Sequence, residues 1–143
     1  MNNCRRQAIA RIKGGEDYPD ICGKVVFYQR DNGVIVDVHV SHLPKNSTGF
    51  FGFHIHEGDN CAGDDFSATG GHYNPTGKPH PLHAGDLPPL LSGSGNAYMR
   101  VLTNRFAVKD IIGKTVVIHS DTDDFRSQPS GNAGDKIACG VIR

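Results

Sequence analysis

The sequence lacks an excess of charge, a long apolar run and a closely spaced cysteine pair. Lys plus Arg and Asp plus Glu number 15 each, so the overall charge indicates no nucleic-acid partner and no anionic membrane surface. No apolar run reaches transmembrane length, and the opening MNNCRRQAIARIKG has no hydrophobic segment of the signal-peptide type. We therefore expect a cytoplasmic protein without a membrane partner. A periplasmic or secreted location is the alternative, if a signal peptide has been removed.

Four cysteines are present, Cys4, Cys22, Cys61 and Cys139, and none of them form a CxxC motif. This excludes the zinc-finger and thioredoxin patterns, which depend on that spacing. The four thiols permit at most two disulfides, and their positions alone do not say which residues pair.

A sustained helical period is also absent. Apolar and β-branched residues instead recur in short segments between turn signals, over 7–13, 23–30, 34–43, 50–56, 96–103, 115–119 and 137–142. These segments predict an all-β, antiparallel barrel or sandwich, and 143 residues suit one domain spanning 1–143.

Two long stretches, 57–95 and 120–135, do not have this strand pattern. Structureless loops of such length are uncommon in a compact domain and are usually functional. Disorder is the alternative for both. The first loop is rich in glycine and proline and carries three histidines and an aspartate, with which a metal ion could hold it in place.

Histidine is abundant, with eight in the chain, and six of them fall between positions 54 and 119. In GFHIHE, His54 and His56 are two residues apart on a predicted strand, so both rings project from one face and can grip one ion. A lone HxH on a strand is more often solvent-facing. His39 and His42 have odd spacing and no partner motif, and we assign them no role.

The second group of ligand-type residues lies inside the first long loop, in a stretch of fifteen positions, and comprises His72, His80, His83 and Asp86. Three nitrogens and one carboxylate suit tetrahedral zinc without an open position, which is typical of a structural site. A solvated loop with chance histidines is the alternative. His119 ends the predicted strand TVVIH, where it can face the His54 pair.

Together these motifs resemble the copper/zinc superoxide dismutase family. GFHIHE, GGHYNP, HAGDL, TVVIH and SGNAGDKIACGVI occur in the family's order, and the resemblance extends from AIARIKG to ACGVI. It implies an eight-stranded antiparallel Greek-key barrel or sandwich with two long functional loops. It also implies disproportionation of superoxide to oxygen and hydrogen peroxide.

The resemblance assigns a role to each ligand. His54, His56 and His119 would bind copper, His80, His83 and Asp86 would bind zinc, and His72 would bridge both ions. Imidazole ligands suit copper, and a set of histidines with one aspartate suits zinc. Copper would do the redox work, whereas zinc would fix the loop and tune His72.

Further roles follow from the same resemblance. Asp123 would link a copper histidine to a zinc histidine, with Asp124 as the neighbouring alternative and Asp121 only solvated. Cys61 and Cys139 would form the intrasubunit disulfide. That bond is unusual in a reducing cytosol. Cys4 and Cys22 have no family counterpart and are predicted to be free thiols.

The sequence departs from the family at the residue that guides the anion. Lys136 in GDKIACG stands where the family has an arginine. Lysine keeps the positive charge but lacks the planar guanidinium group that can donate two parallel hydrogen bonds to superoxide. The preceding loop is short and acidic, and Arg126 could compensate. This motivates an alternative function, a dismutase-like module that stores or delivers copper with little turnover. A copper chaperone is a predicted partner, and we expect a monomer or a homodimer.

Overall fold

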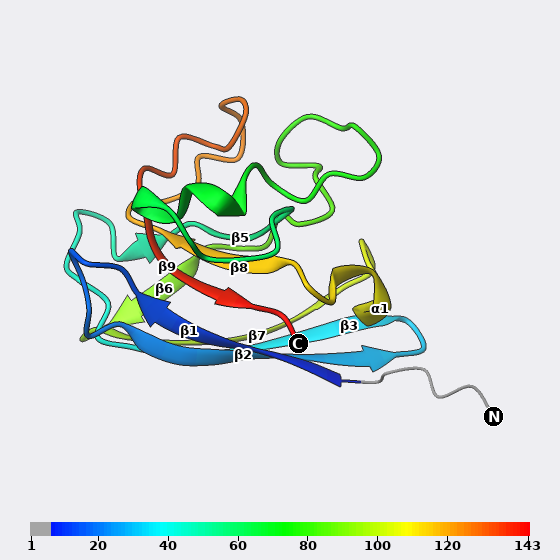
Figure 1. Ribbon diagram of the computed structural model, residues 1–143, viewed down its shortest axis with the longest axis horizontal. Helices are drawn as coiled ribbons and strands as arrows, with labels where there is room; N and C mark the ends of the chain where they lie inside the picture. The colour runs from blue at the N-terminus through cyan, green and yellow to red at the C-terminus, as the bar shows by residue number, and fades with distance from the viewer. Residues whose placement is uncertain (1–6) are drawn as a thin grey trace.

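The computed structural model describes residues 7–143, which fold as an antiparallel β-barrel with two long loops at one end (Figure 1). The strands in this range are β1 (Gln7–Gly14), β2 (Cys22–Arg30), β3 (Gly33–Ser41), β4 (Phe50–Phe51), β5 (Phe53–His56), β6 (Leu90–Gly93), β7 (Asn96–Thr103), β8 (Thr115–His119) and β9 (Lys136–Val141). Two short helices accompany them, a 3₁₀ helix η1 (Asp64–Thr69) and α1 (Val108–Ile111).

The strand order shows how the sheet closes. It runs β4-β6-β7-β3-β2-β1-β9-β8-β5, and every pair is antiparallel. The two ends of this order, β4 and β5, are separated in the chain only by Gly52. The sheet therefore returns on itself as a nearly closed barrel. Eight of the strands have four residues or more, so the predicted barrel is confirmed, with β4 as an additional two-residue strand.

Strand β3 illustrates why these segments form strands. Its valines at positions 34, 36, 38 and 40 alternate with more exposed residues, and all four are at most 2% exposed. Alternation with a period of two sends one face of a strand into the core and the other toward solvent. The same pattern in β1 buries Ala8, Ala10 and Ile12.

Two elements lie inside the segment that we predicted as loop 57–95. Strand β6 pairs with β7 through Ser92 and Gly93, and η1 contacts β9. Neither has a long apolar pattern of its own, because each is only a few residues long. Within residues 7–143, no helix has the length and apolar character needed to cross a membrane.

Backbone hydrogen bonds hold both long loops against the barrel. In the first loop, Tyr73 N donates to Ile55 O at 2.8 Å, and Ile55 N donates to Gly85 O at 2.9 Å. In the second, Asp121 N donates to Ala133 O at 2.8 Å, and Asp124 N donates to Gly131 O at 3.0 Å. The loops thus carry their side chains to the outer face of β5 and β8.

Candidate metal centre

Strands β5 and β8 position the first group of histidines. The two strands are antiparallel neighbours, and His54 lies opposite Val117. Phe53 and Ile55 point into the core, so His54 and His56 share the opposite face, as the spacing predicts. His119 ends β8, where a register shift interrupts its pairing with β9.

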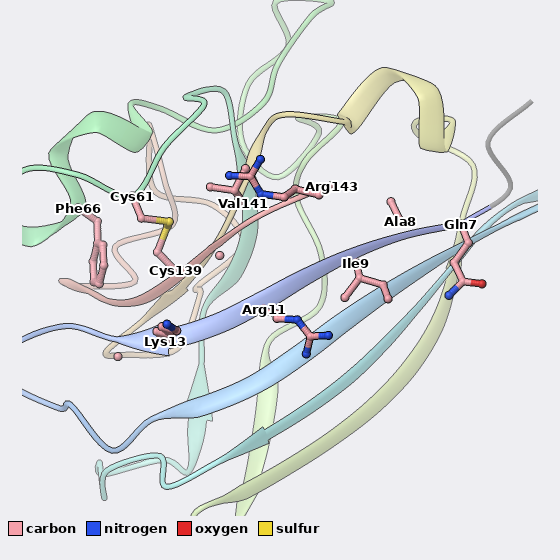
Figure 2. A pocket seen from close by; sticks show the side chains of 12 residues that line it. Gln7, Ala8, Ile9, Arg11, Lys13, Cys61, Phe66, Cys139, Val141 and Arg143 are labelled. Atoms are coloured by element: carbon pink, nitrogen blue, oxygen red, sulfur yellow. A yellow bond between two sulfur atoms is a disulfide. The ribbon is translucent and has the colours of Figure 1, made fainter.

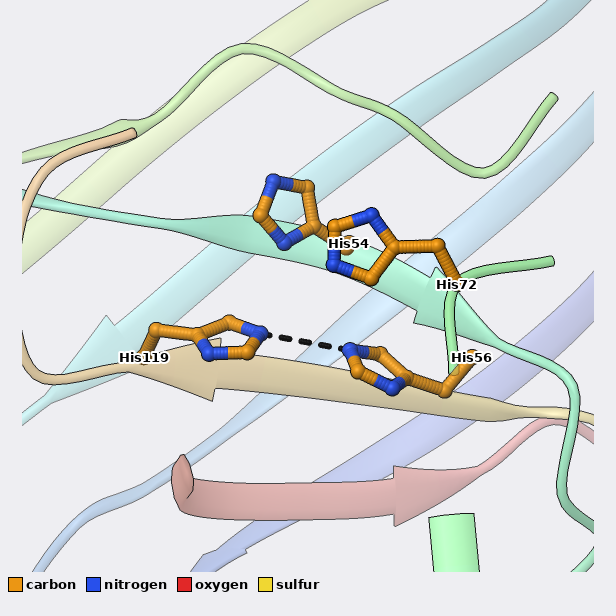
Figure 3. Close-up of side chains that lie close together, drawn as sticks. All are labelled: His54, His56, His72 and His119. Atoms are coloured by element: carbon orange, nitrogen blue, oxygen red, sulfur yellow. Dashed lines mark hydrogen bonds between the residues drawn. The ribbon is translucent and has the colours of Figure 1, made fainter. Parts of the chain in front are cut away.

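His72 joins this group from the first long loop, through a backbone bridge to His56 (Figure 3). The rings of His54 and His72 are 4.1 Å apart between centroids, and those of His56 and His119 are 5.3 Å apart. His56 Nε2 lies 3.2 Å from His119 Nε2. All four residues are buried, and their ligand nitrogens lie within 4.8 Å of one another.

The second group lies beside the first, and Asp86 is at its centre. Asp86 Oδ1 is 2.7 Å from His72 Nδ1, whereas its Oδ2 is 3.0 Å from His80 Nδ1 and 3.2 Å from His83 Nδ1. His72 Nδ1 and His83 Nδ1 are 3.2 Å apart. The predicted set of three histidines and one aspartate therefore converges through one nitrogen of each ring.

His72 belongs to both groups. Since its Nδ1 lies against Asp86 and His83, its Nε2 is the nitrogen left for the first group. A ring that offers one nitrogen to each side can bridge two cations, and two flanking dications stabilise the doubly deprotonated imidazole that this requires.

Three buried ring nitrogens in these groups have no hydrogen-bond partner: His54 Nδ1, His72 Nε2 and His80 Nδ1. His80 Nδ1 lies 3.0 Å from Asp86 Oδ2, but the angle between the two groups is not that of a hydrogen bond. A buried polar atom without a partner costs about 1–3 kcal/mol. Three of them in one cluster fit the chemistry of a metal site, because a metal cation accepts the lone pairs of ring nitrogens.

The ionisation states of the cluster suit cations as well. Burial lowers the pKa of His56 to about 2 and that of His119 to about 3, and it also lowers the pKa of His54 and His83. These rings are therefore neutral near pH 7, which is the form that binds metal.

Asp86 supplies the negative charge. Burial acts to raise the pKa of this carboxyl, but the hydrogen bond with His72 and the neighbouring imidazoles more than offset this effect. The net pKa is lowered, so Asp86 is ionised.

Asp123 connects the two groups from outside. Its Oδ2 accepts a hydrogen bond from His54 Nε2 at 2.8 Å, and its Oδ1 accepts one from His80 Nε2 at 2.8 Å. Both rings must then carry a proton on Nε2, which leaves their orphaned Nδ1 atoms with free lone pairs. Burial acts to raise the pKa of Asp123, but these two hydrogen bonds and one from Phe125 N lower it overall.

Comparison with known proteins agrees with this geometry. Residues 21–142 match the family model described as copper/zinc superoxide dismutase. The chain belongs to this family. A copper/zinc superoxide dismutase of Aquifex aeolicus is 38% identical over 139 residues, which is 87% of this chain and 80% of the relative.

Solved structures of relatives share the fold. The copper/zinc superoxide dismutase of Brucella abortus superposes with a TM-score of 0.80 at 27% identity, covering 96% of this chain and 99% of that one. A superoxide dismutase-like protein of Bacillus subtilis gives a TM-score of 0.79 at 28% identity, covering 94% of this chain and 97% of that one.

Family membership identifies the two groups. The copper site consists of His54, His56, His72 and His119, and the zinc site consists of His72, His80, His83 and Asp86. The Cys61–Cys139 disulfide of the dismutase family is also formed, with Cα atoms 6.0 Å apart. Cys22 is free, as predicted, and it is exposed, whereas Cys4 lies outside the described residues.

Lys136, the departure from the dismutase motif, lies beside the copper site. Its Nζ donates to Thr69 Oγ1 at 2.8 Å and to Gly70 O at 3.0 Å. His56 Nδ1 donates to the same Gly70 oxygen at 2.8 Å. Burial lowers the pKa of Lys136, and its charge helps to lower the pKa of both His56 and His119.

Other residues from the sequence analysis lie apart from the ligands. Asp124 accepts from the backbone of Arg126 and Ser127, so it stabilises a turn. Asp121 is exposed. His39 packs against the Tyr98 ring at 4.0 Å, and within residues 7–143 no metal-type cluster includes it or His42. The compensating role of Arg126 stays a prediction.

The sequence analysis missed two side chains that hold the zinc-site loop. Gln128 Oε1 accepts from His80 N at 2.9 Å, and its Nε2 donates to His80 O at 2.7 Å. Arg105 donates to Pro81 O at 2.7 Å and to His83 O at 3.1 Å. Both contacts join distant segments through backbone atoms, so no local motif indicates them.

Gly131 is a third missed residue. Its φ is 76°, and a Cβ atom there would lie 2.0 Å from Asp123 Oδ1 and 2.6 Å from His80 Nε2. Only glycine tolerates both this backbone conformation and this close approach to the carboxylate of Asp123.

Proposed function

We propose that this protein disproportionates superoxide to oxygen and hydrogen peroxide. The observation that carries the proposal is the sharing of His72 by two buried four-residue groups. A domain that only stores or delivers copper does not need the shared histidine or the complete zinc set. Copper, when bound, supplies the alternating one-electron oxidation and reduction of superoxide, whereas zinc supplies charge and no redox change.

The ligand residues prepare the site for this reaction. His54, His56 and His119 are held neutral by burial, so they can bind copper without first losing a proton. His72 Nε2 is the ring nitrogen that faces the copper group, and it is the atom we assign to carry a proton toward the departing peroxide. Asp123 keeps the rings of His54 and His80 in the tautomer that binds metal.

Lys136 is the residue we assign to guide the anion. Two oxygen acceptors, Thr69 Oγ1 and Gly70 O, fix its ammonium group next to the copper ligand His56. A fixed positive charge at the entrance to a site raises the association rate of an anionic substrate. Lysine does so as a point charge, without the two parallel hydrogen bonds that arginine can offer.

The decisive experiment measures superoxide consumption by protein loaded with both metals, with occupancy checked by elemental analysis and copper EPR. We expect turnover well above that of the same concentration of free copper. Turnover equal to the free-copper background at full occupancy would instead support the copper-storage or delivery module.

The role of Lys136 requires a separate comparison. Lys136→Gln should lower the rate roughly threefold to tenfold and weaken its dependence on ionic strength, because the guiding charge is lost. Lys136→Arg should raise the rate at unchanged metal content. Lys109→Gln, an exposed change on α1, is the matched control. If Lys136→Arg leaves the rate unchanged or lowers it, Lys136 is not the guiding residue.

Assembly and copper delivery belong to the same proposal. We propose that the chain works as a monomer or a homodimer and receives copper from a chaperone protein. Analytical ultracentrifugation of the loaded protein distinguishes the two assemblies. Copper content after expression with and without a co-expressed chaperone tests delivery. The cytoplasmic location stays a prediction, which cell fractionation can test.

A further inference from the structure

The ammonium group of Lys136 has three N–H donors, and the protein uses two of them. One donates to Thr69 Oγ1 at 2.8 Å and another to Gly70 O at 3.0 Å. Among residues 7–143, no carboxylate forms an ion pair with this group. The third N–H and the uncancelled positive charge are therefore left for an anion.

Thr69 can only accept a hydrogen bond from Lys136. Its hydroxyl has a single proton, which it donates to Phe66 O at 2.8 Å. A lone pair of the hydroxyl oxygen must then face the ammonium group. The Thr69 residue is 0% exposed, so water does not compete for this position.

The segment that carries Thr69 is held against the strand that carries Lys136. Thr69 is the last residue of η1, Lys136 is the first residue of β9, and η1 contacts β9. Figure 2 shows Phe66 of η1 next to the Cys61–Cys139 disulfide, which joins this loop to β9. The hydroxyl and the backbone of the lysine are therefore fixed relative to each other.

A cavity with a volume of about 540 Å³ offers the Lys136 ammonium group other partners. Lys136 lines it together with five exposed carboxylate residues, Glu16, Asp17, Asp64, Asp65 and Asp135. Lysine has a flexible four-carbon stem, so its ammonium group can turn toward a different acceptor. An ion pair in this cavity would cancel the charge that the copper site uses.

We propose that Thr69 is a positioning residue that keeps the Lys136 ammonium group beside the copper site and out of the acidic cavity. The ammonium group has two positions, one on Thr69 and Gly70 and one on the carboxylates of the cavity. The Thr69 hydroxyl selects the first. This inference rests on the proposed function, because it gives Thr69 a part in guiding superoxide.

The first measurement follows the lysine itself and needs no turnover. An ammonium group held by hydrogen bonds exchanges its protons slowly enough to be seen by proton–nitrogen correlation NMR, and Lys136→Gln identifies the signal of Lys136. We expect the signal in the reduced, metal-loaded protein and in Thr69→Ser, which keeps the hydroxyl. Thr69→Val should shift the signal or abolish it. A signal unchanged in Thr69→Val would overturn the proposal.

The second measurement is the rate constant for superoxide at equal copper and zinc content. Thr69→Val should lower it roughly threefold to tenfold, the range expected for Lys136→Gln, and weaken its dependence on ionic strength. Thr69→Ser should restore most of the rate. Thr69→Ala removes the same hydroxyl and is used if the valine variant does not fold. Ser67→Ala, an exposed change in the same helix, is the matched control and should alter neither measurement.

Variants of the cavity separate capture of the lysine from simple repulsion of superoxide. Asp64→Asn combined with Asp65→Asn should raise the rate of Thr69→Val by a larger factor than that of the unchanged protein, because only the released lysine is captured. Asparagine tolerates the left-handed conformation of Asp65, whose φ is 50°. Equal factors in the two backgrounds would show that these carboxylates act on the anion alone, which contradicts the proposal.

The two measurements also distinguish this proposal from the proposed function. Absence of turnover in the fully loaded, unchanged protein would overturn both, and the NMR signal would still report the position of Lys136. Normal turnover with a rate that does not respond to Thr69→Val would overturn the role of Thr69 alone.

Discussion

Replacing Asp123 by Asn tests how the two metal sites are connected. The carboxylate accepts a hydrogen bond from His54 Nε2 and another from His80 Nε2, each at 2.8 Å. An amide has only one oxygen, so its NH₂ group must face one of the two rings. That ring then either loses its hydrogen bond or moves its proton to Nδ1, the atom that should bind the metal.

The magnitude follows from the contacts. A hydrogen bond to a charged group contributes about 1.5–3 kcal/mol, and about 1.4 kcal/mol corresponds to a tenfold change in affinity. Loss of one bond should therefore weaken metal binding by about 10- to 100-fold, which is typical for residues that orient metal ligands. In Asp123→Asn one of the two metal affinities should fall in this way. Asp123→Ala removes both hydrogen bonds, one to a histidine of each site, so both copper and zinc affinities should fall.

The assay is competition between the protein and a chelator of known affinity, for each metal in turn. Asp124→Asn is the matched control, because that neighbouring carboxylate contacts only the turn at Arg126 and Ser127. Circular dichroism and the intact disulfide verify folding of each variant. Unchanged affinity for both metals in Asp123→Asn and in Asp123→Ala would refute the orienting role.

Two more predictions concern the stability of the metal-free protein and the loop that packs against the Asp123 carboxylate. The unfolded state takes up protons on His56 and His119 as the pH falls through 6.5, whereas the folded pKa values are about 2 and 3. The free energy of unfolding should therefore decrease below pH 6.5, by up to about 1.4 kcal/mol per pH unit for each ring. Urea denaturation at pH 7.5 and 5 measures this, and an unchanged midpoint would contradict it. Gly131→Ala should reduce zinc retention at least tenfold, as a Cβ there meets the bridging carboxylate. Gly77→Ala, which has a similar φ of 63° but open space, should retain zinc, and equal losses would refute the steric argument.

The strands and most ligands were predictable because their signals are local. Alternation in β3 and the spacing of His54 and His56 depend only on neighbouring residues, and the structure confirms both. The pairing of Cys61 with Cys139 came from family resemblance alone, since four cysteines leave several pairings open. It too is confirmed.

The remaining features depend on contacts between distant segments. Strand β6 has only four residues, and its pairing with β7 comes from the hairpin rather than from an apolar pattern. Gln128 and Arg105 act on backbone atoms 48 and 22–24 residues away. Such contacts leave no periodicity in the sequence, so only the folded chain reveals them.

The reciprocal pair between Gln128 and the backbone of His80 has a thermodynamic consequence. It joins the first long loop, which carries the zinc ligand His80, to the second long loop, which carries Asp123. The two loops must therefore become ordered together. The first ion to bind meets the entropic cost of ordering both loops, and the second ion binds to a site already formed. We therefore expect copper and zinc to bind with positive cooperativity, and by linkage each should raise the affinity for the other by the same factor.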